Sequence, residues 1–402
     1  MTQTITTTCC IAGGGPAGMM LGFLLARAGI DVTVLEKHGD FLRDFRGDTV
    51  HPSTLELMSE LGLLDEFLRR PHQEVHELSA QIGSDHLTVA DFSRVPARCK
   101  FIALMPQWDF LDFLAEHAKR LPSFHLLMTT EATGLIEENS RIVGVRAGEQ
   151  EIRAALNVAA DGRHSVLRDA AGLEVEDFGA PMDVLWFRLS RKPSDSPETF
   201  GHAEPGRLMI MLNRADYWQC AYVIRKGSAA EMQAGPVEVF RAAVVAMAPF
   251  FGDRIGEIRD WTDVKLLTVA VDRLRRWHRP GFLAIGDAAH AMSPVGGVGI
   301  NLAIQDAVAA ADLLTEALRR GRVEEADLDA VQKRREFPVK VIQTGQIFIQ
   351  RQLIDRLLST GAALHAPWPL KFLASIPAVR HLTARVVGVG VRPEHIRVTP
   401  SG

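Results

Sequence analysis

The sequence has few cysteines, no excess of charge of either sign and no signal-peptide pattern. Its four cysteines in 402 residues are too few for the dense disulfide framework of a small secreted protein. The 45 Lys+Arg and 49 Asp+Glu residues leave a net charge of −4, which argues against a general nucleic-acid binder. The N-terminus lacks a basic segment followed by an apolar one, so we expect a cytoplasmic location.

The apolar stretches are also interrupted. The uncharged run 288–305 contains a histidine, a proline and three glycines, so we expect no membrane span there. Hydrophobic residues make up 47% of the chain and charged residues 23%, which are ordinary values for a globular protein. At roughly 150 residues per domain, the length predicts two or three domains.

Residues 9–36 have the pattern of a strand, a glycine turn, a helix and a second strand. The turn reads Gly13-x-Gly15-x-x-Gly18. In such a unit the first glycine permits a tight turn, the second admits a pyrophosphate, and the third lets the helix pack on the strand. The helix N-terminus supplies amide donors, and Glu36 ends the second strand, where a carboxylate binds ribose hydroxyls. The pattern predicts a dinucleotide site without separating NAD from FAD.

Two further motifs follow apolar strands. The first is Asp161-Gly162-x-x-Ser165-x-x-Arg168, which is also explained locally by an Asx turn with Ser165 as a helix N-cap. The second runs from Gly286-Asp287 through Pro294 and a glycine-rich stretch to Asn301, and a long helix follows it. Its glycines allow the backbone to lie against a flat ligand.

The return of a strand, glycine turn and helix near residue 286 predicts a discontinuous dinucleotide domain. Between its parts, residues 181–271 are rich in short β-like runs that we expect to form an antiparallel sheet. The expected boundaries are 1–72, 99–180 and 272–335 for the dinucleotide domain, 73–98 and 181–271 for the β-sheet domain, and 336–402 for a C-terminal helical segment.

Over most of residues 5–335 these motifs resemble the class A flavoprotein monooxygenases, the p-hydroxybenzoate hydroxylase-like family. In that family the three motifs occur in this order, and a substrate domain interrupts the FAD domain. The resemblance implies an α/β fold in which a Rossmann-like FAD-binding domain is interrupted by a mainly antiparallel β-sheet substrate domain, with C-terminal helices. It implies tightly but non-covalently bound FAD, NADH or NADPH as a transient co-substrate, and O₂.

The resemblance also implies a set of cofactor-binding residues. By family roles, the glycines of the first motif contact the pyrophosphate, Arg46 lies beside the flavin, Gln107 lies near the ribityl chain, and Asp161 supports both FAD and the nicotinamide. The whole set is Gly13, Gly15, Pro16, Ala17, Gly18, Glu36, Lys37, Arg46, Gln107, Asp161, Gly286, Asp287, Pro294, Gly299, Ile300 and Asn301. Asp287 would bind the ribityl hydroxyls, and the last three residues would face the flavin pyrimidine ring.

The substrate residues are less defined. Because side chains alternate along a strand, Trp218, Cys220 and Tyr222 share one face. We favour Trp218, Tyr222 and Met211 as pocket residues, although the same residues equally suit a sheet core. No residue stands out as a catalytic base. His72 and His76 are four apart, but the acidic residue between them is out of register for a zinc site, so no metal is expected.

The implied function is an FAD-dependent monooxygenase of aromatic compound metabolism, acting as a monomer or homodimer. It would form a flavin C4a-hydroperoxide and insert one oxygen atom into a small aromatic substrate, by hydroxylation. A flavin reductase or dehydrogenase on the same fold is an alternative, and a non-catalytic escort protein is another. The halogenase branch is disfavoured, because its tryptophan-rich string has no counterpart here.

Overall fold

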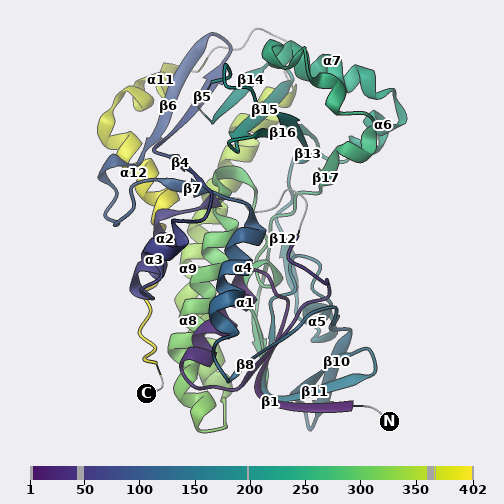
Figure 1. Cartoon of the computed structure of the whole chain (residues 1–402), viewed down its shortest axis with the longest axis vertical. Helices are drawn as coiled ribbons and strands as arrows, with labels where there is room; N and C mark the ends of the chain where they lie inside the picture. The colour runs from purple at the N-terminus through teal and green to yellow at the C-terminus, as the bar shows by residue number, and fades with distance from the viewer. Residues whose placement is uncertain (1–2, 43–48, 197–198, 360–365, 367, 401–402) are drawn as a thin grey trace.

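A computed structural model describes residues 3–42, 49–196, 199–359, 366 and 368–400. One sheet lies at each end of the long axis, and two long helices run along this axis beside the lower of the two sheets (Figure 1). We call the sheet with order β19-β20-β11-β1-β2-β8 the lower sheet, and the sheet with order β17-β13-β16-β15-β14-β5-β6 the upper sheet. This arrangement confirms the expected α/β fold class.

The lower sheet is parallel at its centre, where β1 pairs with β2 and with β11, and β11 pairs with β20. An antiparallel hairpin of β9 and β10 joins it through β11. Its strands are β1 (Gln3–Ala12), β2 (Val32–Leu35), β8 (Phe124–Leu127), β9 (Gly134–Glu138), β10 (Arg141–Ala147), β11 (Gln150–Ala159), β19 (His278–Arg279) and β20 (Phe282–Ala284).

Helices α1 (Pro16–Arg27), α4 (Gln107–Ala118), α8 (Gly299–Arg319) and α9 (Glu325–Ile349) accompany this sheet, and α8 packs against both α1 and α9. The helical stretch Val295–Arg319 is long and apolar enough to cross a membrane by length and composition. However, 72% of its apolar window is buried inside the protein, so it serves here as a core helix. Pro338 lies inside α9 without ending it.

The upper sheet is antiparallel except where β14 pairs with β5. Its strands are β5 (Glu77–Ile82), β6 (Asp85–Asp91), β13 (Met182–Ser190), β14 (Phe200–Glu204), β15 (Arg207–Asn213), β16 (Tyr217–Arg225) and β17 (Lys265–Leu267). Residues 181–271 also form two helices, α6 (Ala229–Ala234) and α7 (Val237–Met247), which the purely β-like interpretation of this region missed.

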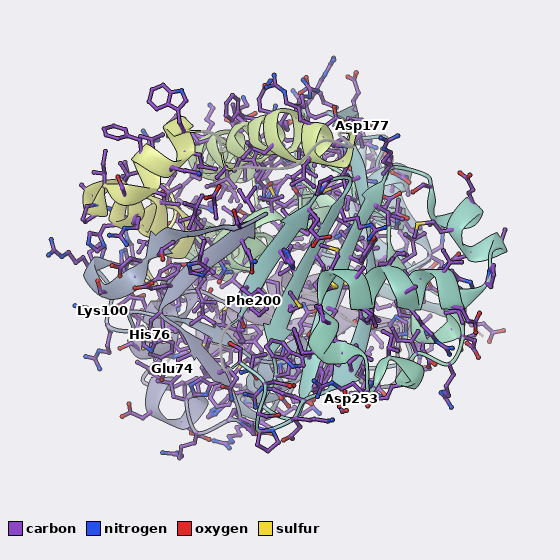
Figure 2. All side chains as sticks on the ribbon, turned by 90° about the horizontal axis from the view of Figure 1, so that it is seen from above. Glu74, His76, Lys100, Asp177, Phe200 and Asp253 are labelled. Carbon is purple, nitrogen blue, oxygen red and sulfur yellow. The ribbon has the colours of Figure 1, made fainter. Side chains whose placement is uncertain are left out.

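The two faces of the upper sheet differ in what covers them. The outer face, which includes Trp218, Tyr222 and Met211, packs against α7 residues such as Phe240 and Val244. Figure 2 looks onto this side, with α7 in front of the strands and Phe200 near the middle of the sheet. The inner face, which includes Val184, Ala221 and Val223, packs against residues that follow α9.

Shorter elements complete the described chain. A small sheet holds β3 (Thr49–Val50), β4 (Gln73–Val75) and β7 (Ile102–Leu104), and β12 (Val175–Asp177) pairs with β18 (Asp272–Leu274). The remaining α-helices are α2 (Pro52–Glu60), α3 (Leu64–Phe67), α5 (Val166–Ala170), α10 (Asp355–Ser359), α11 (Trp368–Ser375) and α12 (Pro377–Gly388), with a π-helical turn at Gln350–Ile354. The expected C-terminal helices are therefore present.

Candidate functional site

The first glycine motif lies between β1 and α1, and each glycine has a different environment. A Cβ atom built on Gly13 would lie 2.2 Å from Ala160 O, and one built on Gly18 would lie 2.0 Å from Gly13 O. A Cβ on Gly15 would meet nothing within 4 Å. Two glycines are therefore required by close packing, while Gly15 borders open space at the N-terminus of α1.

Glu36, at the end of β2, is held beside this turn. Its carboxylate accepts hydrogen bonds from the Gly14 amide at 3.1 Å and from the His38 amide at 2.9 Å. The residue is 6% exposed. The structure therefore brings Glu36 to the glycine turn as the sequence pattern requires. Lys37, the next residue, is exposed.

The second motif meets the first because β11 lies beside β1. Ser165 is the N-cap of α5 and accepts a hydrogen bond from the Arg168 amide at 3.0 Å. Asp161 Oδ2 accepts the Leu167 amide at 3.3 Å, but Asp161 Oδ1 is buried without a hydrogen-bond partner among the described residues. Burial raises the pKa of Asp161 above its ordinary value. A buried carboxyl oxygen without a partner can accept a hydrogen bond from a ligand hydroxyl.

The third motif packs directly on the first. Gly286 has a φ of +60°, and a Cβ on it would lie 3.1 Å from Ala303 and 3.2 Å from Ala17. The neighbouring Asp287 is partly exposed and pairs with Arg163 of the second motif at 3.3 Å. The three motifs, widely separated in sequence, thus converge at one end of α1.

A buried ionic network, which the sequence analysis missed, fixes this third motif. Asp306 of α8 accepts the Gly286 amide at 3.1 Å, His290 at 2.6 Å and Arg335 of α9 at 2.9 Å. Burial alone would raise the pKa of Asp306, but His290 and Arg335 outweigh it and lower that pKa. Arg335 also reaches Glu394 at 3.3 Å. Asp306 is the one charged residue within the mostly apolar stretch 302–311, and that was the signal available in the sequence.

The start of α8 is tied to the segment that begins at residue 49. Asn301 Oδ1 accepts hydrogen bonds from the His51 amide at 2.9 Å and from Thr54 Oγ1 at 2.7 Å. Thr49 Oγ1 donates to Gly297 O at 2.9 Å. The Asn301 side chain is therefore used within the protein, where it ties the first turn of α8 to residues 49–54. Burial lowers the pKa of His51 to about 4, so this imidazole is neutral at physiological pH.

Buried glutamines of α9 and of the π-helical turn that follows it hold the backbone of the third motif at Ser293–Val295. Gln346 accepts from the Ser293 amide at 3.2 Å and donates to Ser293 O at 3.0 Å and to Val295 O at 2.8 Å. Gln350 donates to Ser293 Oγ at 2.7 Å. Pro294 lies between the two residues whose carbonyls Gln346 binds, so α9 determines where Pro294 sits.

The other sequence candidates are less connected. Gln107 is the first residue of α4, and Gly299 and Ile300 form the first turn of α8, which has no side-chain cap. Arg46 lies outside the described residues. His72 precedes β4 and His76 follows it, so the pair is not on a helix. His76 Nε2 lies 3.1 Å from Glu74 Oε2, and both residues are labelled in Figure 2.

The three substrate candidates lie on the outer face of the upper sheet. Trp218 and Met211 are 0% exposed and Tyr222 is 6% exposed, all within the apolar cluster that includes α7. Trp218 Nε1 donates to Asp195 Oδ2 at 3.0 Å. Their packing favours the sheet-core alternative that the sequence left open.

Comparison with known proteins extends this picture. A family model described as FAD binding domain matches residues 6–344. The chain is 34% identical over 391 residues to 6-methylpretetramide 4-monooxygenase of Streptomyces rimosus, covering 94% of this chain and 92% of the relative.

Solved structures give a consistent result. PqsL of P. aeruginosa, in complex with 2-aminobenzoylacetate, matches with a TM-score of 0.76 and 25% identity, covering 88% of this chain and 98% of PqsL. The Diels-Alderase PyrE3 of the pyrroindomycin pathway matches with a TM-score of 0.76 and 22% identity, covering 97% of this chain and 82% of PyrE3. The second likeness shows a shared fold alone.

Proposed function

The chain belongs to the FAD-dependent monooxygenases of the p-hydroxybenzoate hydroxylase-like family, and we propose that it hydroxylates an aromatic compound bound between residues 293–298 and the inner face of the upper sheet. Bound FAD, reduced by NADH or NADPH, supplies the O₂ chemistry. One observation carries this location: Val295, from the third motif, packs in the same apolar cluster as Val184 and Ala221 of the inner face. The relatives give the reductase and escort alternatives no support.

The convergence of the three motifs supports a division of labour toward FAD. We assign the pyrophosphate to the open side of Gly15 and the first turn of α1, where helix amides attract phosphate. Glu36 is placed for the adenosine ribose, and Asp161 Oδ1 and Asp287 for other hydroxyls. The N-terminus of α8 would stabilise negative charge on a reduced ring.

The cross-strand register defines the proposed substrate floor. Gly201 pairs with Ile210, Ile210 with Ala221, and Ala221 with Trp186, so these residues form one row on the inner face. Trp186 and Ile210 are only half-buried, although they lie in interior strands. A Cβ on Gly201 would have only Ile210 Cγ1 within 4 Å, at 3.8 Å. Apolar walls and free space suit a flat ring and exclude water.

The same reasoning assigns the parts of the chain. We propose that residues 1–72, 99–180 and 272–335 bind FAD, that 73–98 and 181–271 carry the substrate floor, and that 336–402 form a helical brace between them. Gln346 of α9 supports this brace because it binds Val295 of the third motif. We further propose a cytoplasmic monomer or homodimer.

Oxygen incorporation tests the function directly. Purified protein should be yellow and release FAD on acid precipitation. With NADH or NADPH, isotopically labelled O₂ and a panel that includes phenols, naphthols and 6-methylpretetramide, one compound should gain one labelled oxygen atom while it accelerates cofactor oxidation. A compound reduced without labelled oxygen would establish the reductase alternative, and a flavin-free protein would establish the escort alternative.

A further inference from the structure

The stretch from Ala291 to Val298 links two anchored ends. At its start, Gly286 and His290 are fixed by Asp306, and at its end Asn301 and Thr49 fix the first turn of α8. The middle of the stretch is neither helix nor strand at Ser293 and Pro294. Its position therefore depends on contacts from another element.

Those contacts come from one face of α9. Gln346 is 4% exposed, and its side-chain amide binds both the N–H and the C=O of Ser293, as a neighbouring β-strand would. A third hydrogen bond, to Val295 O at 2.8 Å, clamps the other side of Pro294. An amide side chain can satisfy all three groups because it carries two donors and one acceptor oxygen.

The next turn of the same helix extends the clamp. Gln350, 1% exposed, binds Ser293 Oγ at 2.7 Å and begins the π-helical turn Gln350–Ile354. Single π-helical turns are frequent at functional sites. Ile354 then packs against the inner face of the upper sheet in the cluster that holds Val295. One helix thus contacts both boundaries of the proposed substrate space.

We propose that Gln346 is a positioning residue for oxygen transfer, which holds Ser293–Val295 at a fixed place between bound FAD and the inner face. This inference rests on the proposed function. Because water must be kept from the reacting centre, a small displacement of this stretch favours unproductive oxidation over transfer to substrate. Gln346 acts through the backbone that it holds, without itself touching the reacting atoms.

The chain offers a matched control in Gln332, on the same helix. Gln332 is 9% exposed, accepts from the Trp277 amide at 2.9 Å and donates to Arg275 O at 2.9 Å. It clamps backbone by the same chemistry, but its partners lie outside the three motifs. Gln346→Met and Gln332→Met therefore remove similar hydrogen bonds from similarly buried sites.

The experiment compares both variants as FAD-loaded enzymes. We expect Gln346→Met to change the visible absorption and fluorescence of bound flavin and to raise the peroxide released per NAD(P)H oxidised severalfold. Gln332→Met should lower the melting temperature comparably while keeping the parent flavin spectrum and peroxide yield. Equal spectral change in both variants, or a parent-like spectrum and yield in Gln346→Met, would overturn the proposal. If Gln346→Met does not fold, Gln350→Met removes one bond of the clamp and carries the same two readouts.

A second variant adds a pH signature. Gln346→Glu keeps an acceptor for the Ser293 amide, but a carboxylate repels the two carbonyls, whereas its protonated form donates to one of them. Its flavin spectrum should therefore return toward that of the parent as pH falls, and a pH-independent spectrum would contradict the clamp. The spectra test Gln346 even if no compound gains labelled oxygen, a result that would defeat only the proposed function.

Discussion

Two tryptophans, one on each face of the upper sheet, have opposite surroundings. Trp218 on the outer face is fully buried, lies 5.9 Å from Phe250 and 6.4 Å from Phe251 between ring centroids, and donates its N–H to Asp195. Trp186 on the inner face is half-buried, and its Nε1 has no hydrogen-bond partner among the described residues. The outer face is completely packed at Trp218, whereas the inner face leaves Trp186 half-buried with an unpartnered donor.

This difference is the reason for proposing the substrate site at the inner face. Buried polar groups are nearly always hydrogen-bonded in proteins, so an unpartnered buried donor requires an explanation, of which a ligand is one. Aromatic residues alone do not identify a pocket, because α7 supplies Phe240 to cover one face completely. The inner face is covered instead by aliphatic residues that follow α9, and Val295 of the third motif packs against the same cluster.

The largest expected effect separates the two faces by stability. Trp218→Ala should lower the free energy of unfolding by about 3–5 kcal/mol, as large-to-small changes in packed cores do. Trp186→Ala should cost about 1–2 kcal/mol, because less of that side chain is packed. Urea unfolding of the FAD-loaded proteins measures both. Equal losses of unfolding free energy in the two variants would contradict the proposed difference between the faces.

The sequence predicted the glycine turn between β1 and α1 because the constraints on that turn are local. Gly13 and Gly18 are needed where a Cβ would collide with backbone 2.2 Å and 2.0 Å away, so spacing alone identifies the turn. Similarly, alternation correctly placed Trp218 and Tyr222 on one face of β16.

Alternation along β16 shows which side chains share a face, but it does not predict which face of the sheet α7 covers. The signal was present in Val237, Phe240, Val244 and Met247, whose spacing fits one helical face. The sequence held a signal at Asp306 but could not identify its partners, because Arg335 is 29 residues from Asp306 and Glu394 is 59 residues from Arg335. Burial of charge depends on the assembled fold and not on neighbouring residues.

The next effect isolates the two indole donors. Trp218→Phe removes a hydrogen bond to the Asp195 carboxylate and should cost about 1.5–3 kcal/mol of folding free energy. Trp186→Phe removes a donor without a described partner and should change stability by less than about 0.5 kcal/mol. Thermal unfolding of both variants beside the parent gives the comparison. A larger loss of stability for Trp186→Phe would mean that the Trp186 N–H already has a hydrogen-bond partner in the folded protein.

A smaller effect sharpens the claim that the inner face is open. Gly201→Val fills space on the proposed floor, so binding of a multi-ring probe such as dihydroxyanthraquinone should weaken by roughly ten- to two-hundredfold. Phenol binding should change less, because one ring need not span the row. Gly134→Val is the control: a Cβ there meets nothing within 4 Å, and β9 belongs to the lower sheet. Flavin absorbance titration measures each dissociation constant. If a folded Gly201→Val variant binds the multi-ring probe as tightly as the parent does, the proposed substrate floor is wrong.

The smallest effect tests the outer face through pH. Burial alone would raise the pKa of Asp195, but hydrogen bonds from Arg254, the Lys192 amide and Trp218 lower it from 3.8 to about 2. The unfolded chain therefore binds a proton at higher pH than the folded protein does. The stabilisation is fully present above pH 3.8 and is lost as pH falls toward 2.

Asp195→Asn should be less stable than the parent at neutral pH. The difference in unfolding free energy between the two proteins should narrow by about 1 kcal/mol on acidification. Urea unfolding of both proteins across that range measures the gap, with Trp186→Phe as a control that should run parallel to the parent. If the unfolding free energy of Asp195→Asn changes with pH in parallel with that of the parent, the Asp195 carboxylate does not stabilise the outer face. That face is then held by packing alone, and it differs from the inner face in shape and not in charge.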